Sequence, residues 1–542
     1  MEHQATLVLR NARIYTQDAE QPWAEALALA GDRVLWAGPD AEAAQWYGPR
    51  THEIDGAGRL ALPGLIDSHF HLLSGARTLG RLQLDAATRI TDVQSRLLAY
   101  AASMPGDGWL VGRGWMYRIF PPGTPIDRRL LDAVIPDRPV LLTAFDGHTA
   151  WANTVALQLA GILEGADTGT PFSTVVMGED GLALGELREG AAINLVRRLI
   201  PPISAEEEED LLRRALRDLA ALGLTAVQNM DGDLPQLELY RRFAARGALS
   251  LRMLVPLLLS PQSRLEQIDE WAAIAATECG PWLRTAAVKL LLDGVVESKT
   301  ALLLAPYNDG SQDLGEANYA QAQFEQLVGY ADAQKLQVFV HAIGDAAVRR
   351  TLDAFAAAQT ANGRRDSRHR IEHVELIDPS DVARFAALQA IASMQPIHAN
   401  FGLDPANTWH RLSGPQRWRW GFPWRKLADA GVPLAFGSDW PVASPDPIRG
   451  LHVALNRPKL DGSGPESDFP DQRVTLPEAI AAYTSAAAYA AHREHEQGRL
   501  KPGYLADVTL LNDNLFALPP EAIGDTKVDI TIVGGEVVWE RT

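Results

Sequence analysis

The stretch His69-Phe70-His71 carries the clearest chemical signal in the chain. It follows an apolar run over residues 60–68 that is typical of a buried β-strand. Residues i and i+2 of a strand point to the same side, so the two imidazoles leave the strand in parallel. Imidazole is a common ligand of transition-metal ions. We therefore expect His69 and His71 to bind one metal ion.

Further side chains of ligand type lie at the ends of, or within, later apolar runs, and they are Lys289, His341, His373 and Asp439. Each has an ordinary structural explanation when it is taken alone. A histidine after a strand is often a hydrogen-bonded core residue, a lysine stem often packs along apolar surface, and an aspartate often begins a turn. All these separate explanations would have to be correct at once, and such a coincidence is improbable. We therefore favour a single metal centre formed by these residues.

These residues need a scaffold that brings distant strand ends together. Apolar, strand-like runs end near His71, Met230, Leu259, Asp293, Gly344, Glu375, Pro396 and Asp439. From the second run onward their spacing is that of a βα unit, with helical patterns between them over residues 205–222 and 319–335, among others. This alternation predicts an α/β fold, a (β/α)8 TIM barrel. The active site of such a barrel lies at the C-terminal strand ends, where the ligand-type residues occur.

The two ends of the chain are expected to form a separate small domain. Residues 1–60 and 495–542 contain short strand-like segments, and Gly534-Gly535 between two β-branched runs is a strong hairpin signal. We assign both segments to one composite β-sandwich and residues 61–494 to the barrel. An insertion after the first barrel strand, about residues 76–202, is expected to cover the barrel mouth, and its topology cannot be assigned from the sequence.

Composition excludes several classes of function. Acidic residues outnumber basic ones by 68 to 50, which argues against a nucleic-acid partner. Cys279 is the only cysteine, so a Cys-x-x-Cys zinc site is excluded. The N-terminus lacks the pattern of a signal peptide, and no apolar stretch reaches membrane-spanning length. We expect a cytoplasmic enzyme with a small-molecule substrate and no membrane partner, and a homodimer on base rates alone.

Several motifs together resemble those of a known family. They are HFH after LPGLIDS, VKLLLDG, HAIGDAAV, RIEHVE and GSDWPV. The set resembles the amidohydrolase superfamily, and more narrowly its amidohydrolase 3 branch, which includes N-substituted formamide deformylase. The resemblance covers nearly the whole chain. It is specific for the superfamily and weak for the substrate, because this branch is catalytically diverse.

The resemblance implies a role for each candidate ligand. His69 and His71 would bind the more buried metal, and His341 and His373 the second one. Lys289 would be carboxylated by carbon dioxide and bridge the two ions, whereas an unmodified lysine would leave a mononuclear site. Asp439 would act both as a ligand and as the proton acceptor. Zinc is the expected ion, with manganese, iron or cobalt as alternatives.

The reaction implied is hydrolysis of a C–N amide-type bond, in an N-substituted amide or formamide. Metal-activated hydroxide would attack the carbonyl, and Asp439 would serve as general base and then as general acid. The same ligands would suit hydrolysis of a cyclic imide, a carbamate or an ester, or a deamination. A non-catalytic regulatory role is the remaining alternative, and no ligand is lost from the sequence to support it.

The substrate pocket is less well marked, and its candidates are Trp115, His148, Gln228, Glu297 and His398. Tryptophans also gather in the last quarter of the chain, at positions 409, 418, 420, 424 and 440. If they line the mouth, they favour an apolar substituent on the substrate. The alternative, equally compatible with the sequence, is that they pack the loops.

Overall fold

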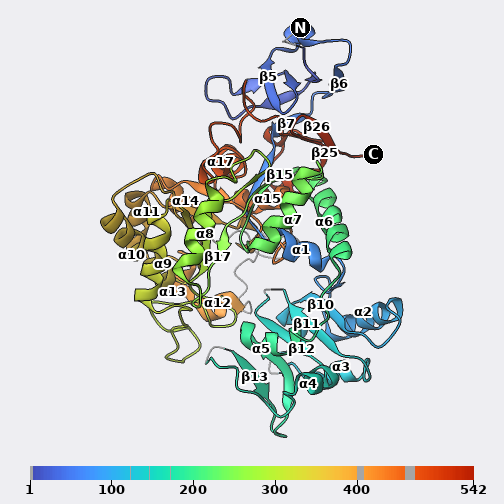
Figure 1. Ribbon diagram of the computed structural model, residues 1–542, viewed down its shortest axis with the longest axis vertical. Coiled ribbons are helices and arrows are strands. Elements are labelled where there is room, and N and C mark those ends of the chain that lie inside the picture. Colours follow the sequence, from blue (N-terminus) through green and yellow to red (C-terminus); the bar gives the residue numbers. More distant parts are fainter. Residues whose placement is uncertain (1–3, 122–123, 146, 171–172, 400–407, 458–469) are drawn as a thin grey trace. The chain divides into compact units, whose positions relative to one another are not determined.

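The structure is a computed structural model that describes residues 4–121, 124–145, 147–170, 173–399, 408–457 and 470–542 (Figure 1). The chain divides into two compact units. The first comprises Met1–Leu72 and Arg213–Thr542, and the second comprises Leu73–Leu212. Helices α1 (Leu72–Thr78) and α6 (Ala205–Ala220) contain the boundaries between the units.

Parallel strands in chain order form the centre of the first unit. One sheet has the order β18-β16-β15-β8, with β8 (Leu65–Phe70), β15 (Leu224–Asn229), β16 (Arg252–Leu254) and β18 (Leu283–Arg284). The other has the order β17-β19-β20-β21-β22-β23, with β17 (Leu257–Leu258), β19 (Ala287–Leu291), β20 (Gln337–Ala342), β21 (Arg370–His373), β22 (Ile391–Met394) and β23 (Leu434–Phe436). A parallel bridge joins Phe70 to Trp440, so the first and last strands meet.

These ten strands correspond to the eight apolar runs of the sequence, because the third run contains β16 and β17, and β18 and β19 both precede the end of the fourth run. The hydrogen-bonded ladders form two sheets and, in the part of the chain that is described, do not close into one barrel. Helices alternate with the strands as predicted: α7 (Leu234–Ala245), α8 (Leu265–Ala275), α9 (Gln321–Ala333), α10 (Asp345–Asn362), α11 (Val382–Leu388), α14 (Trp424–Asp429), α15 (Pro447–Asn456), α16 (Leu476–Ala482) and α17 (Ser485–Ala490). The short helices α12 (Thr408–Ser413) and α13 (Pro415–Trp418) precede α14.

The first apolar run is two strands and not one. Residues 60–63 form β7 (Leu60–Pro63), which pairs with the C-terminal strand β24 (Val508–Leu511), whereas β8 pairs with β15. The chain passes from one sheet to the other at Gly64, where an added Cβ would lie 2.2 Å from Oγ1 of Thr225. Both halves are buried, so hydrophobicity alone does not reveal that they belong to different sheets.

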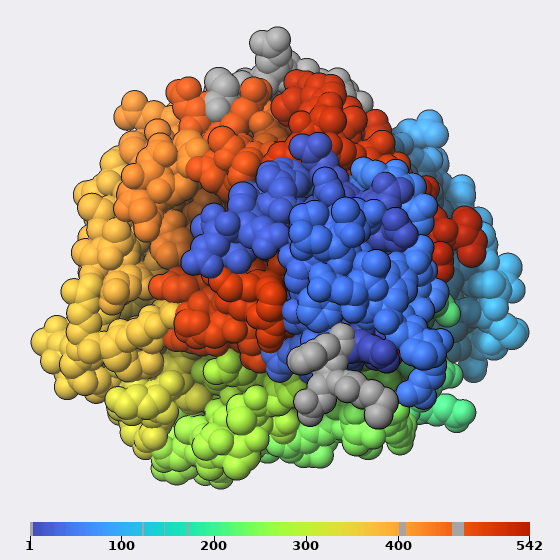
Figure 2. All heavy atoms as spheres, turned by 90° about the horizontal axis from the view of Figure 1, so that it is seen from above, coloured from blue at the N-terminus to red at the C-terminus, as the bar shows by residue number. Residues whose placement is uncertain are grey.

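Strands from both ends of the chain share one six-stranded sheet. Its order is β26 (Glu536–Glu540), β25 (Val528–Val533), β24, β7, β2 (Arg13–Tyr15) and β3 (Trp23–Ala24). A four-stranded sheet of β5 (Arg33–Gly38), β4 (Ala26–Ala30), β1 (Leu7–Arg10) and β6 (His52–Asp55) packs against it through a common apolar core that includes Leu7, Leu29, Val508 and Ile532. Figure 2 shows the N-terminal part of the chain, in blue, next to the C-terminal part, in red. The predicted hairpin is present, because Val533 pairs with Glu536 across Gly534-Gly535.

The second unit contains the mixed sheet that the sequence left unassigned. Its order is β13 (Thr174–Met177), β14 (Ala183–Arg188), β12 (Thr149–Ala152), β11 (Val140–Ala144), β10 (Leu110–Trp115) and β9 (Leu82–Gln83). The helices are α2 (Ile90–Ser103), α3 (Arg128–Asp132), α4 (Thr154–Ala160) and α5 (Glu189–Arg197). That this segment covers the barrel mouth stays a prediction.

Within the described ranges, no helix combines the length and the apolar character needed to cross a bilayer.

Candidate metal centre

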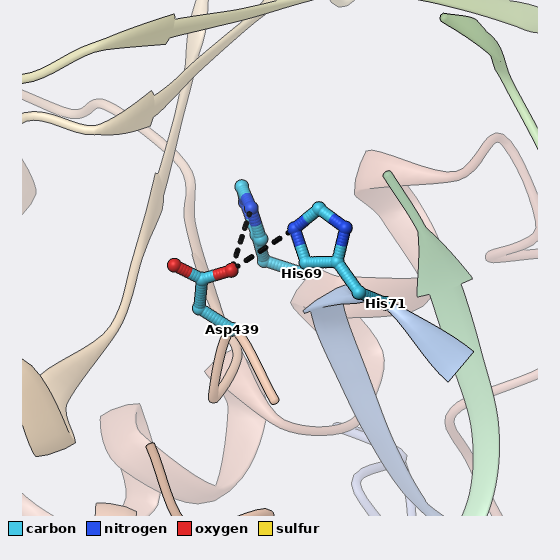
Figure 3. Close-up of side chains that lie close together, drawn as sticks. All are labelled: His69, His71 and Asp439. Carbon is cyan, nitrogen blue, oxygen red and sulfur yellow. Dashed lines mark ion pairs between the residues drawn. The ribbon is translucent and has the colours of Figure 1, made fainter. Parts of the chain in front are cut away.

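The ends of β8 and β23 bring His69, His71 and Asp439 together (Figure 3). Nε2 of His69 lies 3.4 Å from Oδ1 of Asp439, and Nε2 of His71 lies 3.1 Å from the same oxygen. The backbone N–H of Asp439 donates to the carbonyl of His69 at 2.7 Å, so the first and last strands are joined at the site. His69 is 1% exposed and the side chain of His71 is 26% exposed, which leaves His71 as the more accessible of the two.

A buried carboxylate orients His69. Nδ1 of His69 lies 2.7 Å from Oε2 of Glu372, so a proton on Nδ1 leaves the lone pair of Nε2 directed at Asp439. Arg370 donates to both oxygens of Glu372, at 2.8 and 3.0 Å. Histidines that bind metals commonly donate their second N–H to a carboxylate in this way. Glu372 immediately precedes His373 in the sixth run, and this position was the only sequence signal for it.

Gln228 supports this arginine. Its Oε1 accepts a hydrogen bond from Arg370, and its Nε2 donates to the carbonyl of Ala487 at 2.9 Å. The side chain is buried. The sequence suggested a substrate-facing role for Gln228, but the structure places it inside the first unit as a hydrogen-bonding partner of Arg370.

A second group of donors consists of His373, His398 and Asp439, whose ligand atoms lie within 4.8 Å of one another. His373 ends β21 and His398 lies in a 3-10 turn, Pro396–Ala399, after β22. Their rings are stacked, with centroids 6.1 Å apart and planes 10° apart. Nδ1 of His373 lies 2.7 Å from Oε1 of Gln395, which orients its ring as Glu372 orients His69. His398 was expected only as a weak substrate contact.

His341 lies beside this group but its Nε2 points elsewhere. The ring centroids of His341 and His373 are 4.4 Å apart. Nε2 of His341 lies 3.1 Å from the carbonyl oxygen of Gly294 and 3.7 Å from Oδ1 of Asp293. That His341 binds the second metal stays a prediction, and the structure brings His398 toward Asp439 instead.

Lys289 is buried on β19 within the same charged cluster. Burial lowers its pKa to about 8, while the negative charges of Glu372 and Asp439 oppose this shift. Besides burial, the charge of Lys289 helps to lower the pKa values of His69 and His373. Lys289 is therefore close enough to influence both histidines.

The protonation state of His71, the more accessible histidine, depends on the carboxylates of Asp231 and Asp439. Burial acts to lower the pKa of His71, but Asp231 and Asp439 outweigh it and raise this pKa to about 10. Burial acts to raise the pKa of Asp439, but His69 and His71 hold it well below its usual range. Asp439 is therefore ionised at neutral pH. Asp231, whose Oδ2 lies 3.4 Å from Nδ1 of His71, follows β15 and was not singled out from the sequence.

Glu297, another predicted pocket residue of the first unit, lies near the acidic side chain of Glu375. Glu297 is partly exposed after β19, and besides burial its charge raises the pKa of the buried Glu375. Nε1 of Trp409 donates to Oε2 of Glu375 at 2.8 Å. Trp409, Trp424 and Trp440 are all buried, which favours the interpretation that these tryptophans pack the loops.

Two predicted pocket residues, Trp115 and His148, belong to the second unit. Trp115 is fully buried, and its Nε1 donates to the carbonyl of Leu142 at 2.9 Å. It therefore packs the core of this unit, in the same apolar cluster as Leu110 and Leu142. Nδ1 of His148 lies 2.9 Å from Oε2 of Glu189 and the side chain is partly exposed.

Comparison with known proteins agrees with this architecture. Residues 52–539 match the model of the Amidohydrolase family. The chain is 30% identical over 552 residues to Protein LONG AFTER FAR-RED 3 of Arabidopsis thaliana, covering 99% of this chain and 92% of that one. It is 27% identical over 556 residues to N-substituted formamide deformylase of Arthrobacter pascens, covering 100% of both.

A solved structure supports the fold. A metal-dependent hydrolase from Pyrococcus horikoshii superposes with a TM-score of 0.74 at 24% identity, over 95% of this chain and 99% of the other. The match extends over almost the whole length, and the family model covers the parallel strands from β8 to β23 together with the candidate ligands. The chain therefore belongs to the amidohydrolase family.

Proposed function

We propose that the protein is a metal-dependent hydrolase that cleaves the C–N bond of an N-substituted amide or formamide. The observation that carries the proposal is the convergence of His69, His71 and Asp439 at the ends of the first and last parallel strands. The full-length similarity to N-substituted formamide deformylase supports the choice of substrate class.

The donor set fits a divalent transition metal. Two imidazoles and a carboxylate are ligands that zinc accepts, and Glu372 fixes the tautomer of His69 that presents a lone pair. His69, His71 and Asp439 would hold the ion. We propose zinc, with manganese, iron or cobalt as substitutes.

Asp439 is the proton carrier in this proposal. A divalent cation held at the site supplies Lewis acidity toward a carbonyl oxygen and toward water. Asp439 is ionised, so it can accept the proton of the attacking water and later deliver it to the leaving nitrogen. The products are an amine and a carboxylic acid, which is formate when the substrate is a formamide.

We also propose that Lys289 is carboxylated on Nζ and contributes a metal-bridging carbamate. Its burial beside the histidines supports this, because a carbamate offers oxygen ligands that an ammonium group lacks. Enzyme prepared with ¹³C-bicarbonate should show a carbamate carbon signal by NMR, and Lys289→Met should not. A wild-type spectrum without that signal would refute the modification.

Substrate class is tested by a hydrolysis screen on metal-replete and chelator-treated enzyme. The panel contains N-alkyl and N-aryl formamides, other amides, cyclic imides, carbamates, esters and amino-substituted rings. We expect turnover of N-substituted amides with an apolar amine side, lost on chelation and restored by zinc. Turnover confined to imides, esters or ring deamination would replace the proposed reaction, and turnover that survives complete metal removal would refute it.

A further inference from the structure

Two leucines are exposed at the C-terminal ends of neighbouring parallel strands. Leu258, which ends β17, is 40% exposed, and Leu291, which ends β19, is 37% exposed. The two strands pair in parallel, with Leu258 beside Lys289. Folds built from parallel βα units bind their substrates at this end of the strands. Both leucines therefore lie at the end of the sheet where the candidate ligands gather.

The register of β19 and β20 places Leu291 on the face that carries the ligand-type side chains. Residues two apart on a strand share a face, so Leu291 lies on the same face of β19 as Lys289 and Ala287. Ala287 and Phe339 of β20 belong to one buried apolar cluster, which identifies this face as the inner one. Leu291 pairs with His341, and paired residues of adjacent strands point to the same face.

Backbone hydrogen bonds hold Leu258 between two segments of the candidate metal centre. Its N–H donates to the carbonyl of Gly232 at 2.9 Å, and the N–H of Leu259 donates to the carbonyl of Lys289 at 2.8 Å. Gly232 directly follows Asp231, whose carboxylate lies 3.4 Å from a candidate metal ligand. Leu258 is therefore anchored beside the centre on two sides.

A single exposed leucine is common on protein surfaces and has no functional meaning by itself. These two differ because they are diagonal neighbours on one inner face: Leu291 lies two residues beyond Lys289, the partner of Leu258. Small-molecule pockets are lined mainly by apolar side chains around a few polar groups. Three of the tryptophans that the sequence offered for an apolar pocket are buried. The two leucines supply the accessible apolar surface that those tryptophans do not.

We propose that Leu258 and Leu291 form one wall of the substrate pocket and contact the apolar group on the amide nitrogen. The inference rests on the proposed function, because a formamide has no carbon substituent on its acyl side and carries its apolar group on nitrogen. Burial of that group against the leucines favours long alkyl substituents over short ones. The leucines therefore determine specificity and take no part in the chemistry.

A series of substrates with increasing chain length tests the proposal on the metal-replete, full-length enzyme. The measured quantity is kcat/KM on N-methyl-, N-propyl- and N-pentylformamide. In wild type, each methylene group that reaches the wall should raise kcat/KM by up to about fourfold. Leu258→Ala and Leu291→Ala should each lower the pentyl-to-methyl ratio of kcat/KM by about 3- to 30-fold and leave N-methylformamide nearly unaffected.

The ratio does not depend on how much of a variant is folded, because both substrates are measured on the same preparation. Val537→Ala changes a side chain that is also 37% exposed, on β26 of the terminal sheet, and should leave the ratio unchanged. Leu291→Met keeps an apolar side chain of similar volume and should retain most of the wild-type ratio. An unchanged ratio in either alanine variant would overturn the proposal, whether or not its overall activity falls.

Failure of the proposed function gives a different result. N-Alkyl-N-hydroxyformamides carry the same formamide group and nitrogen substituent, and their Kd from isothermal titration calorimetry requires no turnover. If wild type hydrolyses no amide, but its Kd falls with chain length and both alanine variants lose this trend, the reaction is refuted and the leucine wall stands. If N-substituted formamides are hydrolysed with no dependence on chain length, the reaction stands and the wall is refuted.

Discussion

At the scale of single residues, the site depends on partners that fix imidazole orientation. Glu372 and Gln395 each contact the Nδ1 atom of one histidine, at 2.7 Å in both cases. The sequence identified the histidines because strand ends and residue type are visible in it. It did not identify the partners, because a glutamate or glutamine in a buried strand has no distinctive spacing. His398 was recognised as near the site, but only side-chain geometry shows that its Nε2 approaches Asp439.

Replacement of Asp439 tests the proton carrier. Asp439→Asn keeps the size of the side chain but removes the charge and the basic oxygen, so kcat should fall by at least about 100-fold. Steady-state kinetics on the best amide of the screen measure this. Asp429→Asn, at an exposed position on α14, is the control and should retain full activity. Near-wild-type turnover by Asp439→Asn would contradict the assigned role.

Replacement of Glu372 tests a positioning residue. Glu372→Gln weakens the orientation of His69 and should lower zinc affinity by about 10- to 100-fold, as is typical for such partners of metal ligands. Competition with a chromophoric chelator measures the affinity, and added zinc should restore part of kcat. Glu238→Gln, on the exposed side of α7, should bind zinc like wild type. Unchanged zinc affinity in Glu372→Gln would contradict the role of Glu372 in positioning His69.

At the scale of elements, alternating apolar runs and helical patterns predicted the parallel strands and their order. The helix expected over residues 205–222 is α6, where Oγ of Ser204 accepts from the N–H of Glu207 at 3.1 Å. The prediction of one strand over residues 60–68 was wrong, because the apolar pattern shows which residues are buried but not which strand they pair with. For the same reason the sheet order of the second unit could not be derived.

The junction at Gly64 gives a test at this scale. Gly64→Ala places a methyl group 2.2 Å from Oγ1 of Thr225, and we expect the free energy of unfolding to fall by about 1–3 kcal/mol. Urea denaturation followed by tryptophan fluorescence measures the change. Gly329→Ala, where the added methyl meets open space on α9, should be neutral or stabilising by up to about 1 kcal/mol. Adding Thr225→Ala to Gly64→Ala should restore part of the lost stability, because it removes Oγ1 and Cγ2 but leaves Cβ 2.8 Å from the added methyl group. No recovery at all would rule out this clash as the cause.

At the scale of the whole molecule, a buried ion pair ties the parallel strands to the terminal sheets. Nε and Nη2 of Arg252 on β16 donate to the two oxygens of Asp507 at 2.7 and 2.9 Å. Asp507 directly precedes β24 and also accepts from the N–H of Gly534 at 2.9 Å. The terminal segments are therefore linked to the strands that carry the ligands by charge as well as by chain continuity.

Removal of one charge from this pair leaves a buried, unpaired guanidinium group. Asp507→Asn should therefore lower the free energy of unfolding by about 3–5 kcal/mol. Differential scanning calorimetry at pH 7 should show a lower Tm. Asp218→Asn, which removes the acid of an exposed i,i+4 pair with Arg214, should cost less than about 1 kcal/mol. Equal effects of the two substitutions would mean that the Arg252 pair contributes no more than a surface contact.

The switch of sheets at Gly64 also has a consequence for the order of synthesis. β7 ends one residue before β8, and β8 leads directly into His69 and His71. The antiparallel neighbour of β7 is β24, which the ribosome makes more than 440 residues later, from Val508 onward. Until then one edge of β7 stays unpaired, so the strand that carries the first two metal ligands lacks its final anchor. The sheet that anchors the segment before His69 and His71 is therefore completed only when nearly the last part of the chain has left the ribosome.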